Sequence, residues 1–76
     1  MSDAHAGVTL HIDENITNSE RERFRDVLLG LDGVMAAAYH DERPHLMVII
    51  FDPVIIKSIE FVKEARNIGL HAELIP

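Results

Sequence analysis

The chain contains no cysteine among its 76 residues. Soft metal ions prefer thiolate ligands in proteins, so binding of such an ion through paired thiols is excluded. Disulfide bonds are excluded as well, and the core of so small a domain must then be almost entirely hydrocarbon. Hydrophobic residues make up 47% of the chain, which is enough for a core of that kind.

Positive charge is also scarce, with 7 Lys and Arg against 13 Asp and Glu and a net charge of −6. Phosphate backbones and anionic lipid surfaces attract a positive face, so neither nucleic acid nor a membrane is an expected partner. No apolar run approaches the roughly 18 residues that a membrane span needs. The first residues lack the basic and then apolar pattern of a secretory signal, so we expect a cytoplasmic protein.

The first half of the chain predicts a strand followed by a helix. Residues 1–6 form a polar tail that we expect to be disordered, and a single domain is expected over residues 7–76. Apolar and polar residues alternate from position 8 to 13, which predicts a half-buried strand. The charged run over residues 20–26 surrounds an apolar stripe at helical spacing, which predicts a helix with a solvated charged face. Gly33 is expected to turn the chain after this helix.

The second half predicts two strands, a helix and a last strand. The strands are expected over residues 34–40 and 46–51, with a polar hairpin loop at 41–44, and the continuous apolar run makes 46–51 a central strand. A helix over about 57–68 and a strand over 70–75 complete the order β-α-β-β-α-β. This order predicts an α+β, ferredoxin-like sandwich, a four-stranded antiparallel sheet with both helices on one face.

Three segments at fixed positions in this order carry a resemblance to a known family. They read LLGLDGV at 28–34, FDP at 51–53 and NIGLHAEL at 67–74. In sequence and spacing they resemble the heavy-metal-associated domain, which includes copper chaperones and the amino-terminal domains of metal-transporting P-type ATPases. The resemblance covers residues 8–75 and implies the same fold.

The defining motif of that family, a Gly-Met-x-Cys-x-x-Cys loop at the start of the first helix, is missing from this chain. Counted back from Gly33, the two cysteine positions fall on Thr17 and Glu20, and the methionine position falls on Asn15. The resemblance therefore implies a degenerate member without a thiol site. We expect no cofactor and no bound metal.

Thr17 and Glu20 have the spacing of a capping box. In this motif the threonine oxygen accepts a hydrogen bond from the N–H three residues on, and the glutamate accepts one from the threonine N–H. Ser19 and Glu22 have the same spacing, so two start points for the helix remain open.

A metal site built from nitrogen and oxygen ligands is a second hypothesis. Glu20 with Asp13 or His11 could bind a harder ion such as Zn²⁺. His11 and His71 are expected on neighbouring outer-facing positions of the first and last strands, where the two imidazoles could approach each other, as metal ligands or as a pH-sensitive surface pair.

The other histidines are weaker candidates. His40 and His45 flank the predicted hairpin loop, but strand alternation places them on opposite faces of the sheet, which argues against shared ligation. His5 would be the fourth residue once Met1 is removed, and the amino-terminal copper motif needs a histidine in third place.

Strand alternation leaves an apolar surface on the sheet face that the helices do not cover. Its expected members are Ala36, Ala38, Val48 and Ile50. A wet sheet face normally carries polar side chains, and a contiguous apolar patch often marks a contact with another protein. We expect a protein partner or a homodimer through this face, although small and isolated aliphatic residues are also tolerated in water.

The sequence favours a non-enzymatic domain, because it has no nucleophile elbow, no phosphate-binding loop and no histidine–carboxylate pair at an expected pocket. The leading hypothesis is an interaction or regulatory module linked to metal homeostasis or to cation-transporting P-type ATPases. One alternative is a metal carrier with histidine and carboxylate ligands. Another is a small-molecule-sensing regulatory domain, which rests on fold analogy alone.

Overall fold

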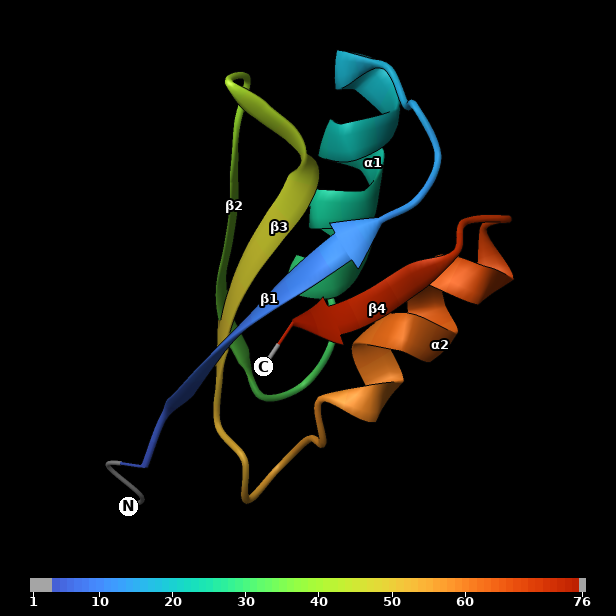
Figure 1. Cartoon of the computed structure of the whole chain (residues 1–76). Coiled ribbons are helices and arrows are strands. Elements are labelled where there is room, and N and C mark those ends of the chain that lie inside the picture. The colour runs from blue at the N-terminus through green and yellow to red at the C-terminus, as the bar shows by residue number, and fades with distance from the viewer. Residues whose placement is uncertain (1–3, 76) are drawn as a thin grey trace.

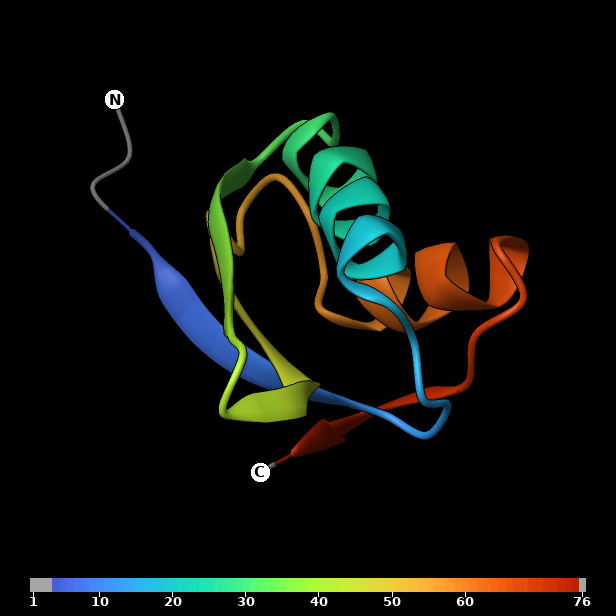
Figure 2. The same ribbon diagram turned by 90° about the horizontal axis from the view of Figure 1, so that it is seen from above.

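A computed structural model describes residues 4–75, which form one four-stranded sheet with two helices on one of its faces (Figures 1 and 2). The strand order is β2-β3-β1-β4, and every neighbouring pair is antiparallel. This is the predicted ferredoxin-like arrangement. In chain order the elements are β1 (Ala6–Ile12), α1 (Asn18–Leu29), β2 (Val34–His40), β3 (Arg43–Phe51), α2 (Ile59–Asn67) and β4 (Ala72–Ile75).

The core lies between the sheet and the helices, as the apolar spacing predicts. In β1, Leu10 and Ile12 are buried, and they alternate with residues that face the other side of the sheet. In α1, Phe24 and Leu28 are one turn apart and fully buried. The remaining buried apolar residues come from β3, α2 and the turn before β4, and they are Met47, Ile49, Phe51, Phe61, Ala65 and Leu70.

The ends of several elements differ from the sequence prediction. The β2–β3 hairpin turns at residues 41 and 42, and Arg43 and Pro44 belong to β3. The pairing of β3 with β1 begins only at Leu46, so the missing N–H of Pro44 interrupts no bond to β1. Of the expected tail, residues 1–3 lie outside the described part of the chain, and β1 already begins at Ala6.

Gly33 makes the turn between α1 and β2 in a conformation that favours glycine. Its φ is +93°, in the left-handed region, and its carbonyl accepts a hydrogen bond of 2.7 Å from the N–H of Asp52. A Cβ at this position would lie 2.9 Å from side-chain atoms of both Ile55 and Ile56. The turn therefore fits tightly against the β3–α2 connection.

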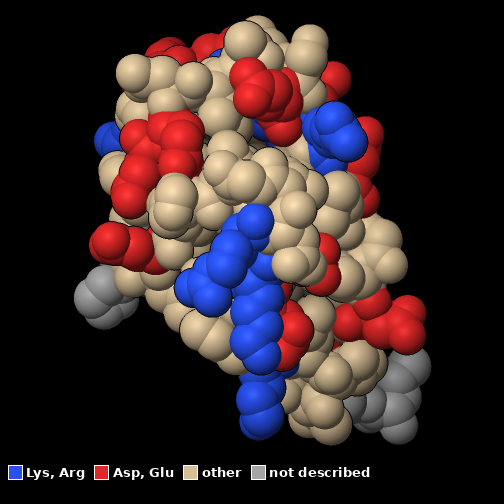
Figure 3. All heavy atoms as spheres, turned by 90° about the vertical axis from the view of Figure 1, so that its right-hand side faces the viewer, with Lys and Arg blue, Asp and Glu red and all other residues tan. Residues whose placement is uncertain are grey.

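Charge is distributed unevenly over the surface. On the side where α2 lies, Lys and Arg side chains form a stripe with acidic groups around it (Figure 3). No helix within residues 4–75 has the length and apolar character to cross a membrane.

Candidate functional site

The start of α1 is the place where the family resemblance locates a thiol pair, and here it is a complete capping box. Thr17 is the N-cap residue with extended backbone angles, φ −74° and ψ 167°. Its Oγ1 accepts the N–H of Glu20 at 3.2 Å, and the Thr17 N–H donates to Glu20 Oε1 at 3.1 Å. The helix begins at Asn18, so the alternative start at Ser19 is wrong. The side chains at both positions where the family has its thiols, Thr17 and Glu20, thus cap the start of the helix.

Arg21 departs from the expectation that the charged run of α1 is solvated, since only 7% of this residue is exposed. The guanidinium Nη1 donates to the Ile16 carbonyl at 3.0 Å, and Nη2 donates to Asn18 Oδ1. Its central carbon lies 5.2 Å from the centre of the Tyr39 ring on β2, a cation–π contact. Burial is the main reason that the pKa of Tyr39 is raised, followed by the Glu22 carboxylate. Arg21 therefore links the helix start to the sheet.

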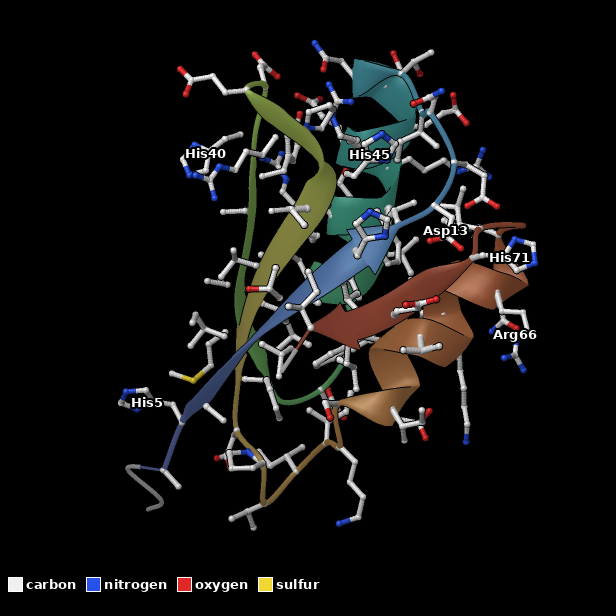
Figure 4. The ribbon with its side chains drawn as sticks, viewed as in Figure 1. His5, Asp13, His40, His45, Arg66 and His71 are labelled. Atoms are coloured by element: carbon white, nitrogen blue, oxygen red, sulfur yellow. The ribbon has the colours of Figure 1, made fainter. Side chains whose placement is uncertain are left out.

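Five titratable side chains gather where β1 ends and β4 begins. His11 Nδ1 lies 3.2 Å from Asp13 Oδ1, and the His11 and His45 rings lie 5.6 Å apart between centres, at 18° to each other. His71 forms a two-point contact with Glu14, in which the His71 N–H donates to Oε1 at 2.8 Å and Nδ1 lies 2.6 Å from Oε2. Figure 4 shows Asp13, His45 and His71 around this end of the sheet.

The pair formed by Glu14 and His71 shifts the pKa of both groups. The backbone N–H of His71, and then its imidazole, lower the pKa of Glu14 below 4.5. The hydrogen bond to the Glu14 carboxylate raises the pKa of His71 above 6.5. The charged forms therefore stabilise each other, and the contact ties the β1–α1 connection to the turn before β4.

The structure does not pair His11 with His71, although the sequence analysis expected their imidazoles to approach each other. β1 and β4 are neighbours, as expected, but His11 lies opposite Glu73 in the ladder, and each of the two imidazoles pairs with a different carboxylate. His40 and His45 lie well apart, on the two sides of the hairpin (Figure 4). Within residues 4–75, no group of three or more His, Asp or Glu side chains is placed to hold a metal ion.

The uncovered sheet face has the apolar surface that strand alternation predicts. Ala36 lies opposite Ile50 and Ala38 opposite Val48, so the four residues form two adjacent cross-strand pairs. Val48 is 40% exposed, and both alanines are exposed. A pocket of about 330 Å³ lies beside Val48 and Ala38, with Leu46 and Thr9 among its lining residues.

A second apolar surface, at the opposite end of the sheet from His45 and His71 (Figure 4), was not predicted from the sequence. Val54 and Ile55 in the β3–α2 connection are 75% and 60% exposed, and Met35 at the start of β2 is 61% exposed. A pocket of about 570 Å³ lies between Met35, Ile55 and Gly33. The sequence contained a sign of this surface, because the aliphatic residues 54–56 follow Asp52-Pro53 directly, in a segment that was predicted to be a connection.

Comparison with known proteins identifies the fold. No family model matches the chain, and no curated protein matches it in sequence. Among solved structures, oxidised MerP from Ralstonia metallidurans CH34 is 16% identical and superimposes with a TM-score of 0.85, over 96% of this chain and 100% of that one. A copper-binding domain from HMA7, a P-type ATPase, is 17% identical, with a TM-score of 0.82 over 92% of this chain and 93% of that one.

A third similar structure is the N-terminal domain of PacS from Synechocystis PCC6803, which is 10% identical and has a TM-score of 0.78 over 93% of this chain and 98% of that one. These likenesses extend over nearly the whole chain. They confirm, at the level of the fold, the resemblance to heavy-metal-associated domains that the sequence indicated. The chain therefore has the fold of these domains and carries a threonine–glutamate capping box, without any cysteine, at the start of its first helix.

Proposed function

We propose that this chain is a non-enzymatic interaction module linked to metal homeostasis, and that it contacts a protein partner through the uncovered sheet face. The observation that carries the proposal is the combination of the fold with the capping box at Thr17 and Glu20. Structures that align with this fold over nearly the whole chain include a copper-binding domain of a P-type ATPase. In this chain, the two positions at which the family motif has cysteines carry Thr17 and Glu20, and both side chains accept hydrogen bonds from backbone N–H groups.

The sheet face supports the proposal because it is the apolar surface most regularly built from secondary structure. Ala36, Ala38, Val48 and Ile50 come from two adjacent, hydrogen-bonded strands, so their positions are fixed in the free protein. A rigid apolar surface loses little conformational entropy on binding. We place the module in the cytoplasm, with a metal-transporting ATPase domain or a second copy of the chain as the partner.

The proposal is tested by titration of the ¹⁵N-labelled chain in two ways. One raises the concentration of the chain itself, and the other adds the soluble metal-binding domains of P-type ATPases from the same genome. We expect saturable amide shifts centred on Ala36, Ala38, Val48 and Ile50 in at least one titration. Val48→Lys should abolish them, because a charged side chain would be desolvated in the contact.

Val54→Lys is the matched control, since it introduces the same charge at a more exposed valine outside the sheet. It should leave the shifts unchanged. The proposal fails if neither titration produces shifts on the sheet face, or if the two lysine variants weaken the contact equally.

A further inference from the structure

Two imidazoles meet at the end of β1, away from the capping box. His11 lies within β1 and His45 within β3, and their ring centres are 5.6 Å apart. The β1–β3 ladder ends at the pair formed by His11 and Leu46. Beyond this pair β3 continues without a partner on its β1 side, and there the His45 ring lies against His11. This contact could not be predicted from the hairpin alone.

Hydrogen bonds fix which nitrogen of each ring carries the proton. His45 Nδ1 lies 2.7 Å from the Ile12 carbonyl oxygen, which can only accept, so Nδ1–H is the donor. His11 Nδ1 lies 3.2 Å from Asp13 Oδ1, and an ionised carboxylate also only accepts. In both neutral rings the lone pair is then on Nε2. Histidines that bind metals usually have this arrangement, in which the other ring nitrogen donates to a carbonyl or carboxylate.

The spacing of the rings matches that of two imidazoles on one ion. With a metal–nitrogen distance of about 2.1 Å and a tetrahedral angle, the centres of two ligating rings lie on the order of 5 to 6 Å apart. The observed 5.6 Å falls in this range. The two rings are nearly parallel, at 18° to each other, so they must rotate before both Nε2 atoms can face one ion. The His11 side chain is 43% exposed, which leaves the pair accessible to an ion from solvent.

The surroundings of the pair favour a cation. The Asp13 carboxylate is hydrogen-bonded to the His11 ring, and Glu73 lies opposite His11 in the β1–β4 ladder. The whole chain has a net charge of −6. Within residues 4–75, no Lys or Arg forms a hydrogen bond or an ion pair with either ring.

We propose that His11 and His45 bind one divalent transition-metal ion of intermediate softness, such as Zn²⁺, through their Nε2 atoms. Water completes the coordination, because the described residues supply no third ligand. The site lies at the ends of β1 and β3, and it uses neither Thr17 nor Glu20. It goes beyond the interaction role proposed above, and each proposal can fail without the other.

The test is a titration of the ¹⁵N-labelled full chain with Zn²⁺, followed through the histidine ring nitrogens. We expect the Nε2 signals of His11 and His45 to shift together and to saturate at one ion per chain. His45→Gln keeps a side-chain N–H that can donate to the Ile12 carbonyl, and it should weaken binding by about tenfold or more. His40→Gln is the control, because it removes one imidazole from the neighbouring strand, and it should leave the affinity unchanged.

Three results would overturn the proposal. The first is the absence of saturation in the wild-type chain, and the second is saturation at other histidines while the signals of His11 and His45 stay in place. The third is equal affinity of the wild-type chain and a folded His45→Gln. If His45→Gln does not fold, the ring-nitrogen shifts of the wild-type chain decide the question alone.

Discussion

At the scale of single residues, Thr17 and Glu20 show how two side chains determine where α1 begins. They satisfy backbone N–H groups that a helix end otherwise leaves unpaired, and each accepts from the backbone of the other. The start of α1 is therefore stabilised locally, independently of any ligand.

Thr17→Ala should lower the free energy of unfolding by about 1 kcal/mol, because it removes the acceptor for the Glu20 N–H. Chemical denaturation followed by circular dichroism would measure the change. Ser19→Ala is the matched control, since Ser19 lies inside the helix and has no capping role. If the serine variant lost as much stability as the threonine variant, the assignment of the cap would be wrong.

Arg21 marks a limit of sequence reasoning at this scale. Within a run of six charged residues, nothing local distinguished it from its neighbours. Its burial depends on Tyr39, which lies 18 residues later on β2 and provides the surface on which the guanidinium rests. The capping box, in contrast, depends on residues three apart and could be predicted.

At the scale of elements, the Glu14–His71 pair joins two connections that are far apart in sequence. Glu14 lies between β1 and α1, and His71 lies between α2 and β4. The pair is strongest when the carboxylate is ionised and the imidazole is protonated. Since the pKa of Glu14 is lowered by its bond from the His71 backbone and the pKa of His71 is raised by Glu14, this condition holds from below pH 4.5 to above pH 6.5.

The pair should make stability depend on pH in a defined window. The contribution of His71 is complete below pH 6.5 and is lost as the pH rises through its higher folded-state pKa. The contribution of Glu14 is present above pH 4.5 and is lost as the pH falls through its lower folded-state pKa. We therefore expect the difference in melting temperature between the wild-type chain and His71→Gln to be largest between these two values.

His40→Gln provides the control for that experiment, because it removes a histidine from β2, at the opposite edge of the sheet from β4. Its melting temperature should follow that of the wild-type chain across the window. A difference between the wild-type chain and His71→Gln that did not change with pH would contradict the role of the ion pair.

The order of the elements and their buried faces could be predicted from the sequence, while several ends could not. The alternation over residues 8–13 and the apolar stripe of the first helix predicted which faces are buried, and Leu10, Ile12, Phe24 and Leu28 on those faces are buried. The start of β3 at Arg43 was missed because a proline in the sequence favours a loop, and only the register shows that Pro44 lies outside the pairing with β1.

At the scale of the whole molecule, the fold should accept the thiol pair that it lacks. Thr17 Oγ1 and Glu20 Oε1 lie 3.1 Å apart, so the side chains at these two positions already converge. Cysteines there would lie at a helix N-terminus, which lowers the pKa of a thiol and favours the thiolate.

Replacement of both residues, Thr17→Cys with Glu20→Cys, should therefore create Cu(I) binding. Competition against a coloured Cu(I) chelator would show uptake of one ion per chain, and the wild-type chain should not compete. Each single cysteine variant serves as a control and should compete much less. Failure of the folded double variant to take up Cu(I) would show that the connection before α1 differs in shape from that of a metal-binding loop. The double variant should also lose about 1 kcal/mol of stability with its cap.

Only part of the candidate site could be predicted from the sequence. Some of its features follow from the local pattern along one strand, and others depend on contacts between segments that are far apart in the sequence. The apolar sheet face followed from alternation along β2 and β3. The contact between His11 and His45 did not, because it depends on where the ladder of β1 and β3 ends. Prediction of the exposed apolar surface formed by Met35, Val54 and Ile55 would require knowledge of how the β3–α2 connection folds against Gly33.

Both edges of the sheet are poor templates for further strands. β4 has only four residues, and the pairing of β2 with β3 shifts register twice, between Val34 and Ala36 and again between Ala38 and His40. Short and irregular edges resist the strand-by-strand growth that leads to fibrils. The chain can consequently keep an exposed apolar face at high concentration, and its encounters should produce discrete, reversible complexes in place of open-ended aggregates.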